Sequence, residues 1–305
     1  MNGVLLRCRF RKITASPLNE DFKLNLLYCC SPLKNTDRRK IDRMMKKRYF
    51  AIPILAIALH LLLSNLLYFL VERLVLDVFH ISPQQFMNYS YWGEILIYAV
   101  LILVFFTLYK LLWRKEISEP RTATNFKDVL GSLVVGFGIC GISGLWIMLA
   151  EQLPSLQKSV EAMNAGAENI AGGNAFGTFM IAVIAAPVVE EILFRGIVLR
   201  SMRKFSPAWV AILMSSVLFG VYHLNIVQAA YATLMGIAAG ILYEKKRNLL
   251  FPILVHFANN LITMLQGFAP SEVNELISIF ILIMIAPAGY VVCRSLRQGK
   301  RADSM

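Results

Sequence analysis

The chain has 305 residues, of which 57% are hydrophobic and 16% charged, and its formal net charge is +12. Soluble domains contain about 25% charged and about 45–50% apolar residues, so this composition excludes a soluble enzyme and indicates an integral membrane protein. The positive charge is concentrated in residues 1–48, which hold 13 Lys and Arg against 4 Asp and Glu. No nucleic-acid-binding motif accompanies this charge, so nucleic acid is not an expected partner.

The basic arm at residues 1–48 has no clear periodicity, and we expect it to be cytoplasmic and partly disordered. The run MMKKRYF within it resembles a common chain opening, which leaves Met44 or Met45 as an alternative start. After the arm, apolar segments recur at about the 20 residues that a helix needs to cross the hydrocarbon core. The predicted segments are about 49–71, 93–113, 129–150, 176–203, two within 205–243, 249–268 and 276–293.

The fifth and sixth segments are predicted from a run without charge. Residues 205–243 contain no Asp, Glu, Lys or Arg, which is enough chain for two helices separated near Asn225–Gln228. Gly236 and Gly240 lie four apart in the second of these helices. Small residues at this spacing allow close helix contact, so the pattern predicts packing without pointing to a function.

Alternation of charge between the loops predicts the topology. Lys and Arg concentrate in the first, third, fifth, seventh and last loops or tails, while the intervening loops are neutral or acidic. Since positive loops stay in the cytoplasm, we predict an all-α polytopic membrane bundle of about eight transmembrane helices with both termini inside. The predicted parts are a basic arm (1–48), N-terminal transmembrane helices (49–124), a core with the polar motifs (125–293) and a cytoplasmic tail (294–305).

The segment APVVEEILFRG places Glu190, Glu191 and Arg195 inside the fourth apolar segment. Each ionisable residue in a span costs roughly 2.5–3.5 kcal/mol even on insertion scales, which makes it a candidate functional residue. Glu191 and Arg195 are four apart, so we expect an ion pair on one helix face. Glu190 lies about 140° from Arg195 around the helix and is predicted to face a low-dielectric cavity as a candidate general base.

Further polar side chains lie in three other predicted helices. His256 and Asn260 are four apart on the seventh segment, and both can donate hydrogen bonds to an oxyanion. Counting along the fifth segment places His223 about 25 Å from its start, so we expect that segment to be tilted or to begin deep in the bilayer. We also expect Pro187 to bend the fourth segment toward the site. His60 is alone on the first segment and is predicted to be structural.

Each of these polar groups also has an interpretation without chemistry. A Glu–Arg pair can anchor a helix near the membrane surface, a single His can form an interhelical hydrogen bond, and Asn can tie helices together. Because three helices place polar groups in their spans, we favour a functional site.

Three short motifs occur in order on successive hydrophobic segments. EEILFR fits EExxxR, FGVYH fits FxxxH, and HFANN fits HxxxN. Over roughly residues 125–293 the chain thereby resembles the CPBP family of CAAX-type prenyl-protein endopeptidases and bacteriocin-processing enzymes, also called Abi. The resemblance implies a helical intramembrane protease in which Glu190, with His223, activates water, while His256 and Asn260 stabilise the oxyanion. It also implies a peptide or lipidated-peptide substrate and a bacterial plasma membrane location.

Other functions stay open at this point. No cofactor is expected, but two His and a Glu would also suit a zinc ion with an open position. A non-catalytic immunity or binding protein could also keep these residues, as the lining of a cavity that binds a partner without cleaving it. A proton-coupled transporter would use Glu and His as a relay, although the internal repeats typical of transporters are not visible in the sequence. The sequence does not predict the oligomeric state.

Overall fold

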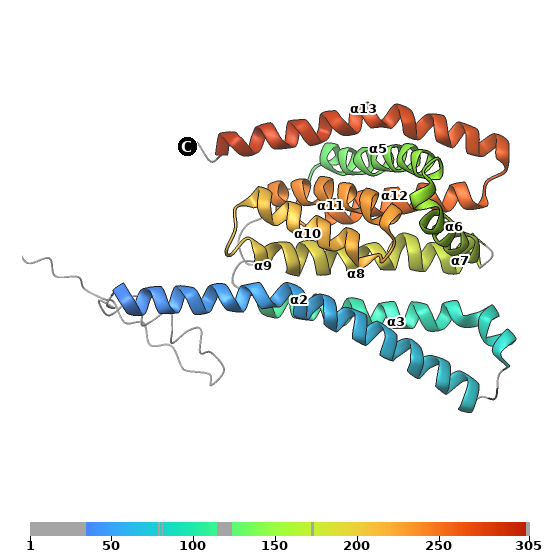
Figure 1. The fold of residues 1–305 in the computed structure, drawn as a ribbon, viewed down its shortest axis with the longest axis horizontal. Helices are drawn as coiled ribbons and strands as arrows, with labels where there is room; N and C mark the ends of the chain where they lie inside the picture. Colours follow the sequence, from blue (N-terminus) through green and yellow to red (C-terminus); the bar gives the residue numbers. More distant parts are fainter. Residues whose placement is uncertain (1–34, 79, 81, 115–123, 172–173, 303–305) are drawn as a thin grey trace, which may run out of the picture. The chain divides into compact units, whose positions relative to one another are not determined.

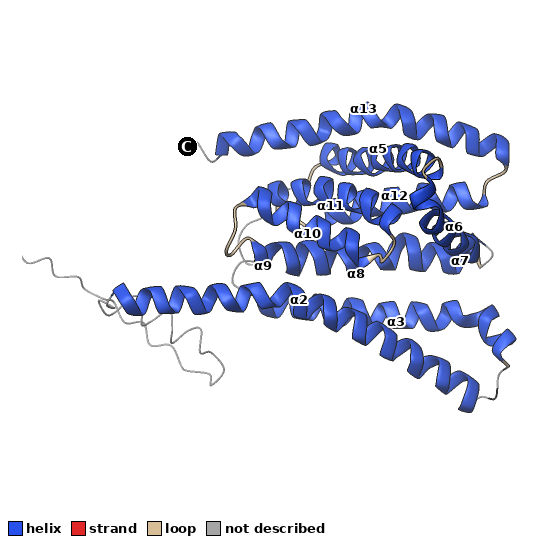
Figure 2. Cartoon of the chain, viewed as in Figure 1, coloured by secondary structure: helices blue, strands red, loops and turns tan. Residues whose placement is uncertain are grey.

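The computed structural model describes residues 35–78, 80, 82–114, 124–171 and 174–302. Every regular element in these ranges is a helix (Figure 2), which confirms the predicted all-α fold. The chain divides into two units, Met1–Lys47 and Arg48–Met305. In chain order the elements are α2 (Asn35–Arg73), the π-helix η1 (Leu74–Val78), α3 (Pro83–Leu112), α5 (Phe126–Glu151), the 3-10 helix η2 (Pro154–Leu156), α6 (Gln157–Ala171), α7 (Ala175–Thr178), the π-helix η3 (Phe179–Ala185), α8 (Ala186–Glu191), the π-helix η4 (Ile192–Leu199), α9 (Arg200–Met202), α10 (Ala208–Tyr222), α11 (Ile226–Lys246), α12 (Leu250–Phe268) and α13 (Ser271–Ala302).

Each apolar segment predicted from the sequence contains a helix. By length and composition, five stretches in the described residues can cross a membrane. The other predicted segments are shorter, as α10 is with 15 residues, or are interrupted by π-helical turns. The chain is therefore a polytopic membrane bundle, while eight crossings and the N-in, C-in orientation stay predictions. The five stretches are Tyr49–Asp77, Ser90–Leu112, Phe126–Glu151, Ile226–Lys246 and Ser271–Arg297.

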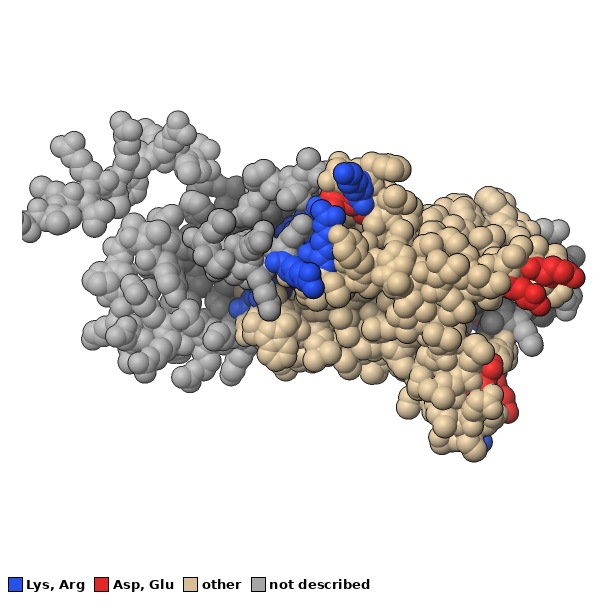
Figure 3. All heavy atoms as spheres, turned by 90° about the horizontal axis from the view of Figure 1, so that it is seen from above, with Lys and Arg blue, Asp and Glu red and all other residues tan. Residues whose placement is uncertain are grey.

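Charged side chains gather at the two ends of the visible described surface (Figure 3). Lys and Arg lie mainly toward one end and acidic residues mainly toward the other, with a broad uncharged band between them. Lipid tails require such an uncharged band. The difference in charge between the two ends agrees with the alternation of loop charges from which the orientation was predicted.

Helix ends coincide with capping residues in the sequence. Asn125 has an extended backbone, and its side chain accepts a hydrogen bond from the backbone N–H of Asp128 at 2.9 Å. Asn225 caps α11 in the same way through the N–H of Gln228 at 3.0 Å. These contacts satisfy N–H groups that have no partner inside the helix. The caps fix where α5 and α11 begin.

Glycines let α5 lie against two neighbours, α12 and α13, and α13 runs beside α5 in Figure 1. A Cβ at Gly136 would lie 2.6 Å from the Cβ of Ala258 and closer still to the carbonyl oxygen of Val255. Gly138 and Gly141 make equally close approaches to the backbone of α13. Such contact of helix backbones is what small residues permit in membranes.

Gly236 and Gly240, which were predicted to allow close helix contact, lie where α11 packs against α10. A Cβ at Gly236 would lie 2.8 Å from the Cβ of Ser216 on α10, and one at Gly240 would lie 3.1 Å from Ile212. The pair α10–α11 is accordingly one of the most extensive helix contacts in the described chain.

Two helical regions were not predicted from the sequence. The basic arm at 1–48 was expected to be partly disordered with no clear periodicity, and α2 begins within it at Asn35. Residues 1–34 of the arm lie outside the described residues. The loop expected at 151–168 contains α6, which packs on α5, α11 and α12. Only a short apolar face of α6, which includes Val160, packs with Trp146 and Val227. The sequence therefore showed no long apolar run from which this helix could be predicted.

Candidate active site

The two adjacent glutamates lie on α8, between two π-helical segments. The elements α7, η3, α8, η4 and α9 follow one another without a break in one rod (Figure 1). At Ala186 the backbone N–H bonds the carbonyl of Ile181, five residues earlier, which is the π pattern. π-Helical turns are frequently found at functional sites, and the sequence analysis did not predict them.

Glu191 forms the ion pair predicted from its spacing. Nη1 of Arg195 lies 2.8 Å from Oε1 of Glu191, and both side chains are buried, with exposed fractions of 1% and 0%. The same oxygen lies 3.1 Å from Nδ1 of His256. The contact with His256 adds to the predicted ion pair, because α12 brings an imidazole to the same carboxylate.

Glu190 has different surroundings from its neighbour. Its Oε2 lies 3.9 Å from Nε2 of His256. This oxygen is buried and has no hydrogen-bond partner among the described residues. The imidazole of His256 thus lies between the two carboxylates, with one ring nitrogen toward each of them.

His223 is held at the C-terminal end of α10. Its Nδ1 lies 2.8 Å from the carbonyl oxygen of Phe219. Since a carbonyl can only accept, Nδ1 carries the hydrogen, and Nε2 of the neutral ring is left as an acceptor. The ring of Phe219 lies 4.9 Å from the ring of His223 and 5.7 Å from that of His256, and the guanidinium of Arg195 lies 4.7 Å above it. Phe219 of α10 therefore contacts both η4, through Arg195, and α12, through His256.

The turn after His223 explains how the predicted fifth segment delivers its histidine. Because α10 has 15 residues, it ends before it could cross a full hydrocarbon layer. Leu224 adopts a left-handed backbone with φ of 55°, and Asn225 then starts α11. The amide of Asn225 donates to the carbonyl of Ser159 at 2.8 Å and accepts from its hydroxyl at 3.1 Å. Residues of α6, which the sequence did not predict, thus fix the turn.

Asn260 contacts the backbone of η3. Its Nδ2 donates to the carbonyl oxygen of Ala182 at 2.8 Å, and its Oδ1 accepts from Nδ2 of Asn259 at 3.1 Å. In the π pattern this carbonyl would be bonded by residue 187, but Pro187 has no N–H. The bend expected at Pro187 stays a prediction, and what the structure shows is that the carbonyl of Ala182 is bound by Asn260 of α12. An amide nitrogen has two N–H donors, so one remains for a further acceptor.

Two side chains near the site were not among the predicted site residues. The hydroxyl of Tyr222 lies 3.0 Å from Nδ1 of His60, which is buried on α2. His60 was predicted to be structural because it is alone on the first predicted segment. Tyr222 lies on the fifth segment, so no spacing along one helix links the two residues in the sequence. The only signal for Tyr222 is its place beside His223 in FGVYH.

The residues do not form an evident metal centre. Among the described residues, no group of three or more His, Cys, Asp or Glu side chains is arranged to hold a metal ion. Oε1 of Glu191 is already shared by Arg195 and His256, so a zinc set of two His and a Glu, the alternative considered from the sequence, would have to use Glu190 with Nε2 of His256, and this alternative stays open.

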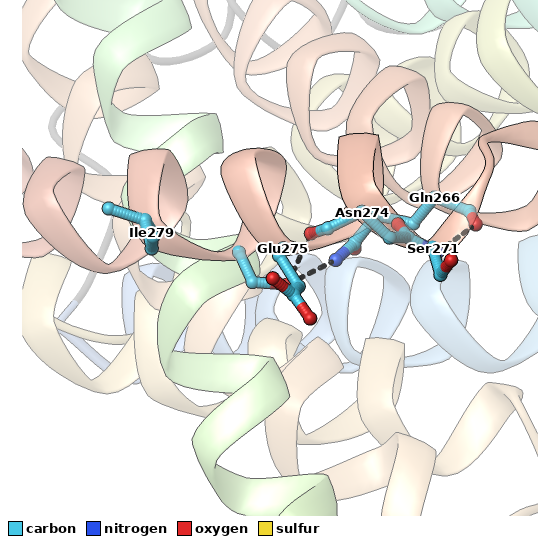
Figure 4. A pocket seen from close by; sticks show the side chains of 6 residues that line it. Gln266, Ser271, Asn274, Glu275 and Ile279 are labelled. Carbon is cyan, nitrogen blue, oxygen red and sulfur yellow. Dashed lines mark hydrogen bonds between the residues drawn. The ribbon is translucent and has the colours of Figure 1, made fainter.

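A separate polar hollow lies where α12 meets α13 (Figure 4). It is an open depression of about 670 Å³, in which the amide of Asn274 donates to the carbonyl of Gln266 at 2.8 Å. None of the six predicted site residues lines it. We assign no chemistry to it.

Comparisons with known proteins bear on the segment that carries this geometry. Residues 172–262 match the family model described as type II CAAX prenyl endopeptidase Rce1-like, which confirms the resemblance to the CPBP and CAAX protease family. These residues include all three motifs. The chain is also 29% identical over 91 residues to the Bacillus subtilis protein named "Putative membrane peptidase YdiL". That match covers 30% of this chain and 37% of the relative, so the chain matches little more than a third of the relative's length. No solved structure matches the chain.

Proposed function

We propose that the chain is an intramembrane endopeptidase that hydrolyses a peptide bond with water activated by Glu190 and His223. The observation that carries this proposal is the difference between two neighbouring carboxylates. Oε2 is buried without a hydrogen-bond partner in both residues, but Oε1 of Glu191 is shared by Arg195 and His256, whereas neither oxygen of Glu190 has a hydrogen-bond partner among the described residues. The family description and the name of the relative support the same class of reaction.

In the proposed reaction Glu190 is the general base. It takes a proton from water while the water oxygen bonds to the peptide carbonyl carbon, and the carbonyl electron pair moves onto oxygen. Nε2 of His223, an acceptor by its tautomer, orients the water. The C–N bond then breaks, and the protonated Glu190 returns its proton to the leaving nitrogen. The products are a carboxylic acid and an amine.

His256 and Asn260 are the proposed oxyanion donors. Nδ1 of His256 donates to Glu191, so a second hydrogen on Nε2 makes the ring a cation. The Nε2 hydrogen and the second N–H of Asn260 are the proposed donors to the oxyanion.

The proposed substrate is a peptide or lipidated peptide presented from the lipid bilayer. The matching family is described as prenyl endopeptidases, which favours a lipidated cysteine near the cleaved bond. The Bacillus relative favours a bacterial plasma membrane. The proposal requires no cofactor.

The test uses the purified full chain in detergent and two internally quenched peptides, one farnesylated and ending in a CaaX sequence, the other identical but without lipid. Glu190→Gln should lower kcat by about 10²–10⁴-fold, which is what general acid–base catalysis contributes. A zinc chelator should leave the wild-type rate unchanged. The matched control is Glu272→Gln, an exposed carboxylate at the start of α13.

Two results would contradict this proposal. Full cleavage activity of Glu190→Gln would refute the proposed role of Glu190 as general base, whereas a wild-type chain that binds the peptides without cutting them would favour a protein that only binds. Loss of wild-type activity in the chelator would establish the zinc-dependent mechanism instead.

A further inference from the structure

A buried histidine from the N-terminal helix reaches the site. His60 lies on α2, outside the segment that matches the family model, and is 4% exposed. Its ring packs 5.3 Å from the ring of Phe105 on α3 and 5.7 Å from that of Tyr222 on α10. An ionisable side chain at this depth is costly, and an otherwise apolar contact between helices does not need one.

Tyr222 connects this histidine to the residues of the proposed reaction. Its ring lies 5.7 Å from the ring of His223, edge to face, and 5.4 Å from that of Phe194. No direct hydrogen bond joins the hydroxyl of Tyr222 to the carboxylate of Glu190 among the described residues. We therefore expect this hydroxyl to act on the reacting water or on the substrate.

The hydrogen bond to His60 determines which way the Tyr222 hydroxyl donates. Nδ1 of His60 lies 3.0 Å from this hydroxyl, and Nε2 is buried without a partner among the described residues. A buried N–H without an acceptor is rarer than an acceptor without a donor. The favoured tautomer therefore carries its hydrogen on Nδ1 and donates to Tyr222. The phenol hydrogen is then free to point toward the site.

We propose that Tyr222 is a further site residue that donates a hydrogen bond to the reacting water or peptide carbonyl, and that His60 is its positioning residue. The inference rests on the proposed endopeptidase function. It assigns to α2 a part in the reaction, because this helix supplies the group that fixes the hydroxyl.

The test measures kcat and KM for single and double variants with the farnesylated and unlipidated quenched peptides. Tyr222→Phe and His60→Phe should each lower kcat by about 10–10²-fold with KM unchanged, since misplacement of a group that acts in the transition state affects kcat. The double variant should lose no more than either single variant, because the two side chains act as one unit. Tyr231→Phe, a half-buried tyrosine on α11, is the matched control.

Conservative replacements separate positioning from packing. An Asn amide reaches about as far as Nδ1 of histidine, whereas a Gln amide reaches about as far as Nε2. His60→Asn should therefore restore most of kcat, and His60→Gln should not. Thermal unfolding of each variant checks folding, and Tyr222→Phe, which removes one oxygen, serves where His60→Phe does not fold.

The outcomes distinguish the two proposals. If Glu190→Gln is inactive while Tyr222→Phe and His60→Phe keep the wild-type kcat, this inference is wrong and the proposed function stands. Independent losses that multiply in the double variant, or a change in KM alone, would equally overturn it. A wild-type chain that cuts neither peptide would refute the proposed function and this inference with it.

Discussion

Adjacent residues of the same type acquire different chemistry here from their contacts. Glu191 is held by a guanidinium and an imidazole, whereas Glu190 faces only the far nitrogen of that imidazole. Neither intrinsic acidity nor depth distinguishes the two carboxyls, since they follow each other in one helical turn. Their difference comes from the spacing to Arg195 and from the side of α8 that meets α12.

The ion pair of Arg195 and Glu191 should contribute strongly to stability. Arg195→Met leaves a carboxylate buried without its main partner, so we expect a loss of about 3–5 kcal/mol in the free energy of unfolding. The double variant with Glu191→Gln should recover part of it, because no uncompensated charge then remains. Thermal or denaturant unfolding in detergent measures both.

A matched control for this variant exists in the same chain. Arg73 and Asp77 have the same spacing, lie 3.8 Å apart and are 58% and 62% exposed. Arg73→Met should leave the melting temperature nearly unchanged, because exposed pairs contribute little. Equal effects of Arg73→Met and Arg195→Met would show that burial does not determine the value of the pair.

At the scale of the elements, hydrophobic length and charge predicted the helices, and contacts between helices escaped prediction. The apolar run at 205–243 was divided correctly near Asn225, because only a turn residue with capping capacity interrupts it. The spacing of Glu191 and Arg195 predicted their bond, because both lie on one helix. The contact of His256 with Glu191 joins positions 65 apart, and no local pattern encodes it.

The π-helical turns were missed for a related reason. They arise where tertiary contacts, such as that of Asn260 with the carbonyl of Ala182, satisfy backbone groups that the α pattern would pair locally. The motif letters of the site were visible in the sequence, while His60 and Tyr222 were not distinguishable from packing residues.

The glycine face of α5 should be more sensitive than its composition suggests. Gly136→Ala introduces a Cβ against the backbone of α12, next to the turn that carries His256 and Asn259. We expect lower thermal stability and lower activity, because α12 cannot move away without displacing these side chains.

Gly144 provides the control on the same helix. No described heavy atom lies within 4 Å of where its Cβ would be. Gly144→Ala should be neutral or stabilising, since Ala favours a helix over Gly by about 1 kcal/mol. If both variants behave alike in unfolding and cleavage assays, close approach of α5 and α12 is not what restricts Gly136.

For the whole molecule, the distribution of charge predicts which way the chain crosses the membrane. Glu272 and Arg297 lie near opposite ends of α13, and both are exposed. In a background without other cysteines, Glu272→Cys should react with a membrane-impermeant thiol reagent on intact cells, and Arg297→Cys only on inside-out vesicles. The reverse pattern would overturn the predicted orientation of both termini.

The short length of α10 affects the surrounding lipid. Its 15 residues rise about 22 Å, about 8 Å less than a typical hydrocarbon layer. Leu213, Met214, Val217 and Val221 are exposed along it and meet acyl chains. A bilayer adapts to so short an apolar face by becoming thinner beside it. Headgroups and water should then lie closer to His223 there than elsewhere around the protein, so under the proposed function a peptide anchored in the membrane would meet water for hydrolysis without leaving the bilayer.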